Sequence, residues 1–253
     1  MIRKKDYNWS LYERIPEGTE GKYCIKKLII PRGNAVKLYH PAGWYFSDVV
    51  NANLPTTRLE CTDGSLWMTD APAEQDQLAL AVAFAHGDVL MLGLGLGLFV
   101  IEVQRRNNPV KSITIIEQSC DVVKLVYPHI KNAKTKIVTD EARSYLSEAA
   151  STGVKFDFIY IDIWAGFTQP IMEAQEWVDL AKPCLREGGT IRYWMQELHE
   201  RVKNKLPTEP TKGNMIIGEP CLVCSKLIRM DYAGLCMDCA DSLSLSELFT
   251  RIK

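Results

Sequence analysis

Three glycines and a later acid form the most informative chemical pattern in this sequence. Gly93, Gly95 and Gly97 follow the apolar run 89–92, and Glu117 ends a second apolar run twenty residues after Gly97. Glycines let the backbone turn sharply and approach a ligand where a side chain would collide. An acid at the end of the neighbouring parallel strand can accept hydrogen bonds from both hydroxyls of a ribose. The spacing predicts a nucleoside site; the alternative is a tight strand-to-helix turn without a ligand.

Strand-like runs alternate with helical segments after this loop. We expect strands over 112–117, 135–138, 156–163 and 190–194 and helices over 120–127, 143–150 and 171–185, with Pro128 ending the first helix and a turn at 187–189. Strands that alternate with helices predict a parallel sheet. Acids follow three of these strands, so they share a carboxyl edge with the glycine loop, and that edge is where open α/β sheets bind ligands.

The spacing of the glycines separates two classes of nucleoside ligand. A dinucleotide fingerprint requires its third glycine three residues after the second, and Leu98 occupies that position. NAD is therefore the disfavoured ligand.

A family resemblance rests on the glycine loop, Glu117, the step from Asp140 to Ala142 and the run 156–162. These motifs resemble the cofactor motifs of class I S-adenosylmethionine-dependent methyltransferases, specifically their spermidine-synthase-like branch, over about residues 57–194. Upstream, the segment 59–70 with Glu74 and Gln77 is similar to the β-hairpin and acceptor-side entry segment of polyamine aminopropyltransferases. The pair at 63–64, Asp-Gly, independently predicts a hairpin turn.

The resemblance implies a role for each candidate cofactor-binding residue. The three glycines would line the methionine and ribose part of S-adenosylmethionine, and Glu117 would hold the ribose hydroxyls. The acid at the adenine amino group would be Glu141, because the acid of the family directly precedes an alanine; Asp140 is the less favoured alternative.

Asp162 is the expected catalytic residue. By resemblance it faces the reactive carbon and the acceptor, where it would orient an amine or take a proton during a direct displacement. Aminopropyltransferases carry a second acid three residues later, and this chain has Ala165. The Pro-Pro-aromatic step of DNA amino-methylating enzymes is also missing after Asp162. We expect a methyltransferase with an unidentified acceptor; aminopropyl transfer and a non-catalytic nucleoside-binding protein remain the alternatives.

Four of the six tryptophans receive a simpler interpretation. Trp44, Trp67, Trp164 and Trp194 are expected mainly in the core. For Trp164, which follows the strand-end acid, stacking on an acceptor ring is the alternative.

Length and composition predict one main domain with small appendages. The chain has 253 residues, is 47% hydrophobic and has a net charge of −1. We expect an α/β fold: a small N-terminal β-rich region (1–70), a Rossmann-like, mostly parallel sheet flanked by helices (71–200), a linker (201–220) and a C-terminal module (221–253). Only 26 residues separate Trp194 from Cys221, which predicts a truncated or differently completed sheet.

The longest apolar run, 89–101, is shorter than the ~20 residues of a membrane helix. The N-terminus also lacks a signal-peptide pattern. We therefore expect a cytoplasmic protein without a membrane partner.

Four cysteines near the C-terminus have the spacing of a metal site. They form two Cys-x-x-Cys pairs eleven residues apart: Cys221, Cys224, Cys236 and Cys239. Four thiolates at this spacing suit tetrahedral zinc, and an all-cysteine set is typical of a closed structural site. Disulfides are the alternative, disfavoured without a secretion signal. Modules of this kind bind nucleic acid, bind protein or brace a neighbouring domain, and the sequence leaves these roles open.

Metal analysis of the purified protein should find about one zinc per chain. Cys221→Ser removes one thiolate ligand and should release the metal, whereas Cys120→Ser, outside the two pairs, should retain it. A protein without zinc whose four cysteines form disulfides contradicts this prediction.

Overall fold

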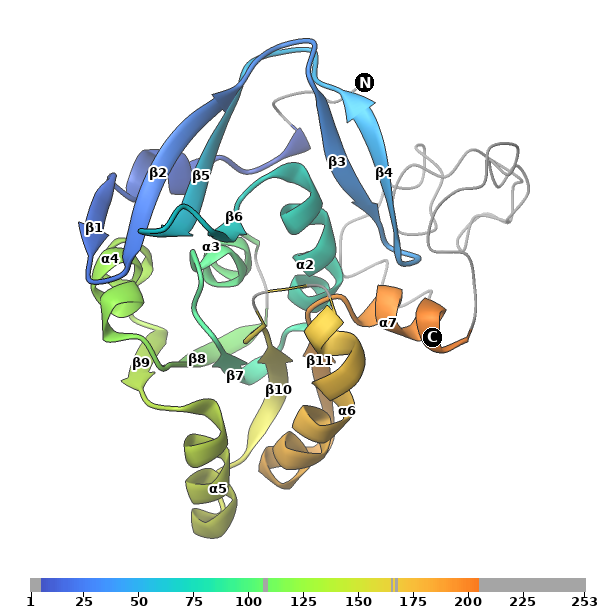
Figure 1. Ribbon diagram of the computed structural model, residues 1–253. Helices are drawn as coiled ribbons and strands as arrows, with labels where there is room; N and C mark the ends of the chain where they lie inside the picture. Colours follow the sequence, from blue (N-terminus) through green and yellow to red (C-terminus); the bar gives the residue numbers. More distant parts are fainter. Residues whose placement is uncertain (1–5, 107–108, 165, 167, 205–253) are drawn as a thin grey trace.

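The computed structural model describes residues 6–106, 109–164, 166 and 168–204. Within this part of the chain, a parallel sheet with helices on both faces lies below a group of antiparallel strands (Figure 1). Only the first four residues of the predicted linker are described. The rest of the linker and the four cysteines of the predicted zinc module lie outside the described residues.

The parallel sheet confirms the expected α/β architecture. Its five strands pair in parallel in the order β11-β10-β7-β8-β9. Their bounds are β7 Gly87–Leu92, β8 Val110–Glu117, β9 Thr135–Thr139, β10 Phe156–Ile161 and β11 Leu185–Tyr193. The chain moves outward from β7 through β8 to β9 and then crosses to β10, so the direction of winding reverses between β7 and β10. Such a reversal opens a crevice at the carboxyl ends of the strands.

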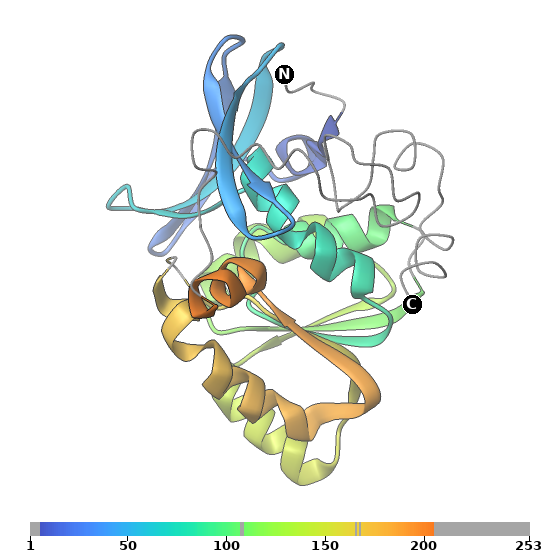
Figure 2. The same cartoon turned by 90° about the vertical axis from the view of Figure 1, so that its right-hand side faces the viewer.

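Helices cover both faces of this sheet, α2, α3 and α4 on one face and α5 and α6 on the other (Figure 2). Their bounds are α2 Pro72–Phe84, α3 Leu98–Arg105, α4 Cys120–Ile130, α5 Ala142–Thr152, α6 Thr168–Ala181, the 3₁₀ turn η2 Lys182–Cys184 and α7 Gln196–Lys203. No helix among the described residues combines the length and the apolar character needed to cross a membrane.

Strand β7 is continuously apolar because it lies at the centre of the sheet, with helices on both faces. Val89 and Met91 belong to the core cluster beneath α2, α3 and α4, whereas Leu90 and Leu92 belong to the cluster beneath α5 and α6. Because helices bury both faces of this parallel strand, the side chains that point to either face are apolar and the usual alternation of apolar and polar residues is missing. Burial of each such side chain contributes about 1.5–3 kcal/mol.

The N-terminal region is built from antiparallel strands. One sheet has the order β1-β2-β5-β6, and β3 pairs with β4 in a separate hairpin. Their bounds, with the preceding helix, are α1 Ser10–Arg14, β1 Gly18–Glu20, β2 Tyr23–Ile30, β3 Ala35–His40, β4 Trp44–Val49, β5 Leu54–Cys61 and β6 Leu66–Thr69. Ile25 and Leu59 belong to the same core cluster as Val89 and the residues of α2, α3 and α4, so this region shares one core with the parallel sheet. The turn at Asp63-Gly64 joins β5 to β6, as predicted.

Three predicted boundaries were wrong. Helix α4 continues through Pro128 to Ile130, because only one backbone donor is lost there and the N–H of Lys131 still bonds to the carbonyl of Tyr127. Helix α6 ends at Ala181, where η2 takes over. Strand β11 begins at Leu185, and the expected turn at 187–189 is an irregularity within the strand, where the register against β10 shifts.

The glycine loop connects β7 to α3, and at Gly93 its backbone lies unusually close to the backbone of Asp162, which follows β10. Gly93 has φ +89°, and a Cβ atom there would lie 2.0 Å from the carbonyl oxygen of Asp162 at the end of β10. A Cβ atom on Gly95 would lie 2.3 Å from the sulfur of Met68. Side chains are excluded at both positions, so the loop can lie between the ends of β8 and β10.

Gly93→Ala should destabilise the protein more than Gly33→Ala, which provides a matched control. Both glycines have φ +89°, but a Cβ on Gly33 meets no atom within 4 Å. We expect Gly33→Ala to cost about 1 kcal/mol through backbone strain alone. The clash in Gly93→Ala should add about 1–3 kcal/mol. Urea unfolding of both variants measures the difference, and equal losses would contradict the close approach.

Candidate functional site

A cavity of about 360 Å³ opens at the carboxyl edge of the parallel sheet. The loops after β7, β8, β9 and β10 line it, and strand β6 and the first turn of α2 close it from the N-terminal region. This volume lies within the range of small-molecule sites, about 300–1,000 Å³. The cavity therefore occupies the position where the winding of the sheet reverses.

Most predicted site residues line this cavity. They are Gly93, Gly95, Glu117, Asp140, Glu141 and Asp162. Among the predicted cofactor-binding residues, Gly97 is the exception and does not line the cavity: it caps the N-terminus of α3, and a Cβ there would lie 2.3 Å from Ile130. Its structural role is close packing of α3 against α4.

Glu117 joins the end of β8 to the glycine loop. One carboxylate oxygen accepts the backbone N–H of Leu94 at 2.9 Å, and the other accepts that of Ser119 at 2.8 Å. Burial raises the pKa of Glu117, and the backbone donors act in the opposite direction. A carboxylate has about four acceptor positions, and the backbone donors of Leu94, Ser119 and Gln118 leave a position for a ligand hydroxyl.

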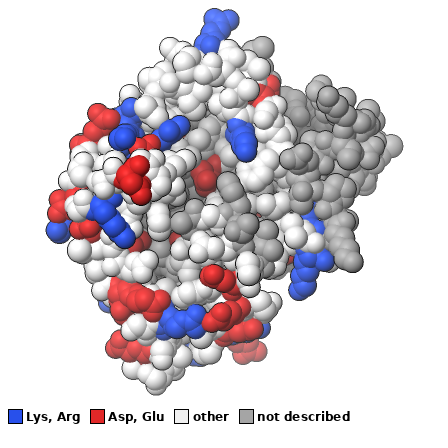
Figure 3. All heavy atoms as spheres, in the orientation of Figure 1, with Lys and Arg blue, Asp and Glu red and all other residues white. Residues whose placement is uncertain are grey.

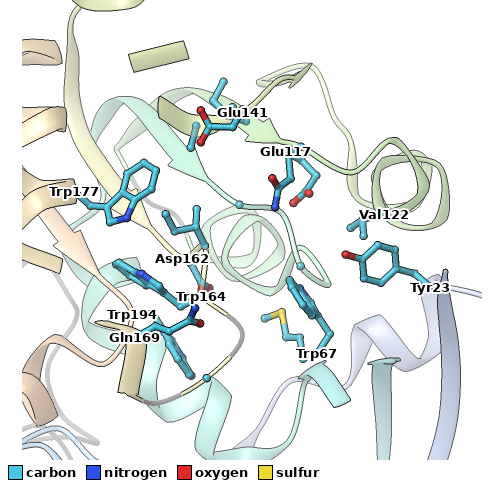
Figure 4. A pocket seen from close by; sticks show the side chains of 18 of the residues that line it. Tyr23, Trp67, Glu117, Val122, Glu141, Asp162, Trp164, Gln169, Trp177 and Trp194 are labelled. Carbon is cyan, nitrogen blue, oxygen red and sulfur yellow. The ribbon is translucent and has the colours of Figure 1, made fainter. Parts of the chain in front are cut away.

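Asp140 and Glu141 follow β9 and hold the start of α5. Asp140 accepts the backbone N–H of Glu141 at 2.7 Å, and Glu141 caps the helix by accepting that of Ser144 at 2.8 Å. Both acids line the cavity, and Glu141 lies on the same side as Glu117 (Figure 4). The ends of two adjacent strands thus supply three acids to one end of the cavity.

Asp162 lies deep in the cavity at the end of β10. Burial, and then the charge of Glu117, raises the pKa of its carboxyl to about 7. Its backbone N–H donates to the carbonyl of Leu92 at 2.9 Å, but its carboxylate accepts no hydrogen bond from the described residues. The group is therefore available to a ligand.

Glu74, in the first turn of α2, is the second deeply placed acid. Burial raises the pKa of its carboxyl to about 8, and the charge of Asp162 contributes in the same direction. The side chain of Trp194 donates a hydrogen bond to this carboxylate. The two acids come from different elements and influence one another across the cavity.

The sequence did not reveal several lining residues. Trp177, Gln169 and Glu173 come from α6, for which the sequence predicts a helix over 171–185 without a site role. Trp194 and Trp67, expected mainly in the core, also line the cavity. No local spacing indicates the contributions of α6 and β11, because only the fold brings these elements to this edge. Trp67 belongs to the segment 59–70, whose resemblance to an acceptor-side entry segment was its only signal.

The charged side chains that line the described part of the cavity are all acidic. Six carboxylic acids line it, Glu74, Glu117, Asp140, Glu141, Asp162 and Glu173, and no lysine, arginine or histidine is among the described lining residues. In the space-filling view, acidic atoms are visible in the hollow at the centre of this face, and much of its surroundings is uncharged (Figure 3). The cavity therefore favours cationic ligands over phosphates and carboxylates.

No protein-family model and no curated protein matches this sequence. Solved structures with a distant likeness include spermidine synthase from Thermotoga maritima, at 16% identity and a TM-score of 0.43, over 71% of this chain and 70% of that chain. A spermidine synthase bound to the transition-state analogue AdoDATO is 17% identical with a TM-score of 0.45, over 71% of each chain.

A candidate S-adenosylmethionine-dependent methyltransferase from Streptococcus mutans is 14% identical with a TM-score of 0.43 over 67% of this chain. This chain spans only 45% of that protein's length. All these scores lie below 0.5, so no function is taken from them.

The raised pKa of Asp162 predicts a pH-dependent stability. An unfolded aspartate has a pKa of about 4, whereas that of Asp162 is about 7 in the folded state. The folded protein therefore binds more protons between these values, and its free energy of unfolding should fall as pH rises from about 4 to about 7. Asp162→Asn cannot ionise, so the fall should be smaller in this variant by at least about 1 kcal/mol.

Urea unfolding at a series of pH values measures this difference. Asp179→Asn is the matched control, because that exposed carboxylate pairs with Lys182 and its pKa is lowered. The same pH dependence in wild type and Asp162→Asn would show that the Asp162 carboxyl is not desolvated.

Proposed function

We propose that this protein transfers the methyl group of S-adenosylmethionine to an acceptor by direct displacement. The observation that supports this most is the convergence of the glycine loop, Glu117, the acids after β9 and Asp162 on one cavity. This is the arrangement that the resemblance to class I methyltransferases implies. When bound, the donor supplies a sulfonium-activated methyl group, so the protein contributes mainly alignment.

The residues present fit a nucleoside donor. Gly93 and Gly95 line the cavity with backbone alone, so a ligand can approach this part of the loop without meeting a side chain of either residue. Glu117 lines the cavity with an acceptor position left beside its backbone donors, and there it would accept from the ribose hydroxyls. We assign the adenine ring of the donor to the edge at Asp140 and Glu141, with Glu141 as the preferred partner of its amino group.

Asp162 and Glu74 would manage the proton of the acceptor. Each is a buried carboxyl with a pKa raised toward neutral values, which suits a group that accepts a proton near pH 7. Asp162 has the better position for catalysis, because its carboxylate has no hydrogen-bond partner among the described residues. Glu74 is held by Trp194 and would orient the acceptor.

A second candidate is transfer of an aminopropyl group from decarboxylated S-adenosylmethionine. The observation that favours it is the lack of any lysine, arginine or histidine among the described lining residues. The carboxylate of the intact donor would have no cationic partner among them, whereas the decarboxylated donor has no carboxylate to pair.

Calorimetric titration with S-adenosylmethionine, decarboxylated S-adenosylmethionine, methylthioadenosine and NAD tests both candidates. We expect the three adenosyl thioether or sulfonium compounds to bind and NAD to fail. Glu117→Gln should weaken their binding at least about tenfold, because hydrogen bonds to a charged group contribute about 1.5–3 kcal/mol.

Glu148→Gln, a change at an exposed position of α5 outside the cavity, is the matched control. Preference for the intact donor supports methyl transfer, and preference for the decarboxylated donor selects aminopropyl transfer. Binding of none of the three compounds would overturn the proposed site.

A further inference from the structure

One end of the cavity differs in character from the end assigned to the donor. Trp164, Trp177 and Trp194 gather on one side, whereas Glu117 and Tyr23 lie on the opposite side (Figure 4). We call the first side the tryptophan end. Its three indoles come from the loop after β10, from α6 and from the residue after β11, and each is buried.

Carboxylates fix two of these indoles. The ring N–H of Trp164 donates to Glu173 at 3.1 Å, and Trp194 donates to Glu74. The ring of Trp164 also packs edge-on against Tyr193, with 6.3 Å between ring centroids. Because their N–H groups are occupied, these indoles offer a ligand only their carbon faces and edges.

Asp162 lies beside this apolar surface, and its carboxylate faces the cavity without a hydrogen-bond donor from the described part of the chain. This residue is only partly exposed where it lines the cavity. A buried polar group without a partner is costly, and a ligand that donates hydrogen bonds and carries positive charge removes this cost. Indole faces attract cations for an independent reason, the negative face of the ring.

We propose that the tryptophan end binds the acceptor, and that the acceptor is an amine that enters as its ammonium ion and packs an apolar substituent against the indoles. This inference rests on the proposed transfer function and names its substrate class. Phosphorylated and carboxylated acceptors, nucleic acids among them, meet only acidic side chains among the described lining residues. A linear diamine lacks the apolar bulk that three tryptophans accommodate.

The chemistry of this acceptor balances without a further reactant. The ammonium ion gives its proton to the carboxylate of Asp162, which exposes the nitrogen lone pair. The nitrogen then forms a bond to the methyl carbon of the donor as the carbon–sulfur bond breaks, and that electron pair remains on sulfur. The product is an N-methylated ammonium ion, and Asp162 returns its proton to solvent.

Four small probes test the proposal on the full chain at pH 8. Benzylamine carries the charge and the ring, benzyl alcohol the ring without charge, benzoate the opposite charge, and putrescine two charges without a ring. Calorimetry with and without saturating S-adenosylhomocysteine should show benzylamine binding at least about tenfold more tightly than the other three, as expected for a desolvated cation over indole beside a carboxylate.

Two variants locate the site. Asp162→Asn keeps the side-chain shape and should reduce the preference of benzylamine over benzyl alcohol to less than about threefold. Trp164→Leu should weaken benzylamine binding about tenfold. Trp44→Leu is its control, since Trp44 stacks on His40 outside the cavity. Circular dichroism checks that each variant is folded, and the comparison of probes on the wild type decides even if one is not.

Equal affinity for benzylamine and benzyl alcohol would overturn the proposal, as would tighter binding of putrescine. Unchanged benzylamine affinity in folded Trp164→Leu would also overturn it. Failure of the proposed function is distinguishable, because the adenosyl compounds are titrated separately. If the adenosyl compounds bind and benzylamine does not, only the acceptor class is refuted. If benzylamine binds and the adenosyl compounds do not, only the donor site is refuted.

Discussion

At Gly93 the backbone that leaves β7 passes so close to the end of β10 that no side chain fits between them. A Cβ there would lie 2.0 Å from the carbonyl oxygen of Asp162, and the backbone N–H of Gly93 bonds to Ile116 at 2.8 Å on the opposite side. The next residue, Leu94, donates its N–H to Glu117. The ends of three parallel strands are thereby held together, and Glu117 and Asp162 lie on either side of one loop. Every role assigned to the cavity depends on this spacing.

The same arrangement gathers negative charge where it is costly to hold. Glu74, Glu117 and Asp162 lie near one another in a poorly solvated space, and burial raises the pKa of each. Backbone N–H groups compensate Glu117, and Trp194 compensates Glu74, but Asp162 accepts no such bond from the described residues. A cationic ligand would relieve this repulsion. We therefore interpret the local instability as the physical basis of ligand preference.

Much of this architecture could be predicted from the sequence, and the reasons are local. Each parallel strand is a short apolar run between helical segments, and the acids after them necessarily share one edge of the sheet. Glycine spacing located the loop, although Gly97 packs against Ile130 and does not line the cavity. The prediction that Pro128 ends the helix was wrong, because a proline removes a single hydrogen bond and the last turn of α4 tolerates this loss.

The tryptophan end was only partly foreseen, because it depends on tertiary contacts. Trp164 was recognisable from its position after the strand-end acid, but Trp177 and Trp194 reach the cavity from α6 and β11. Nothing in their local sequence distinguishes them from core residues. Glu74 carried a weak signal in the hairpin segment, yet its pairing with Trp194 follows only from the packing of α2 against the sheet.

A crystal structure with methylthioadenosine tests the central claim most directly, because this compound contains what both candidate donors share. The account predicts both ribose hydroxyls within hydrogen-bond distance of the Glu117 carboxylate, the base at the edge formed by Asp140 and Glu141, and the sulfur facing Asp162. A nucleoside bound elsewhere, or with its ribose away from Glu117, would contradict it.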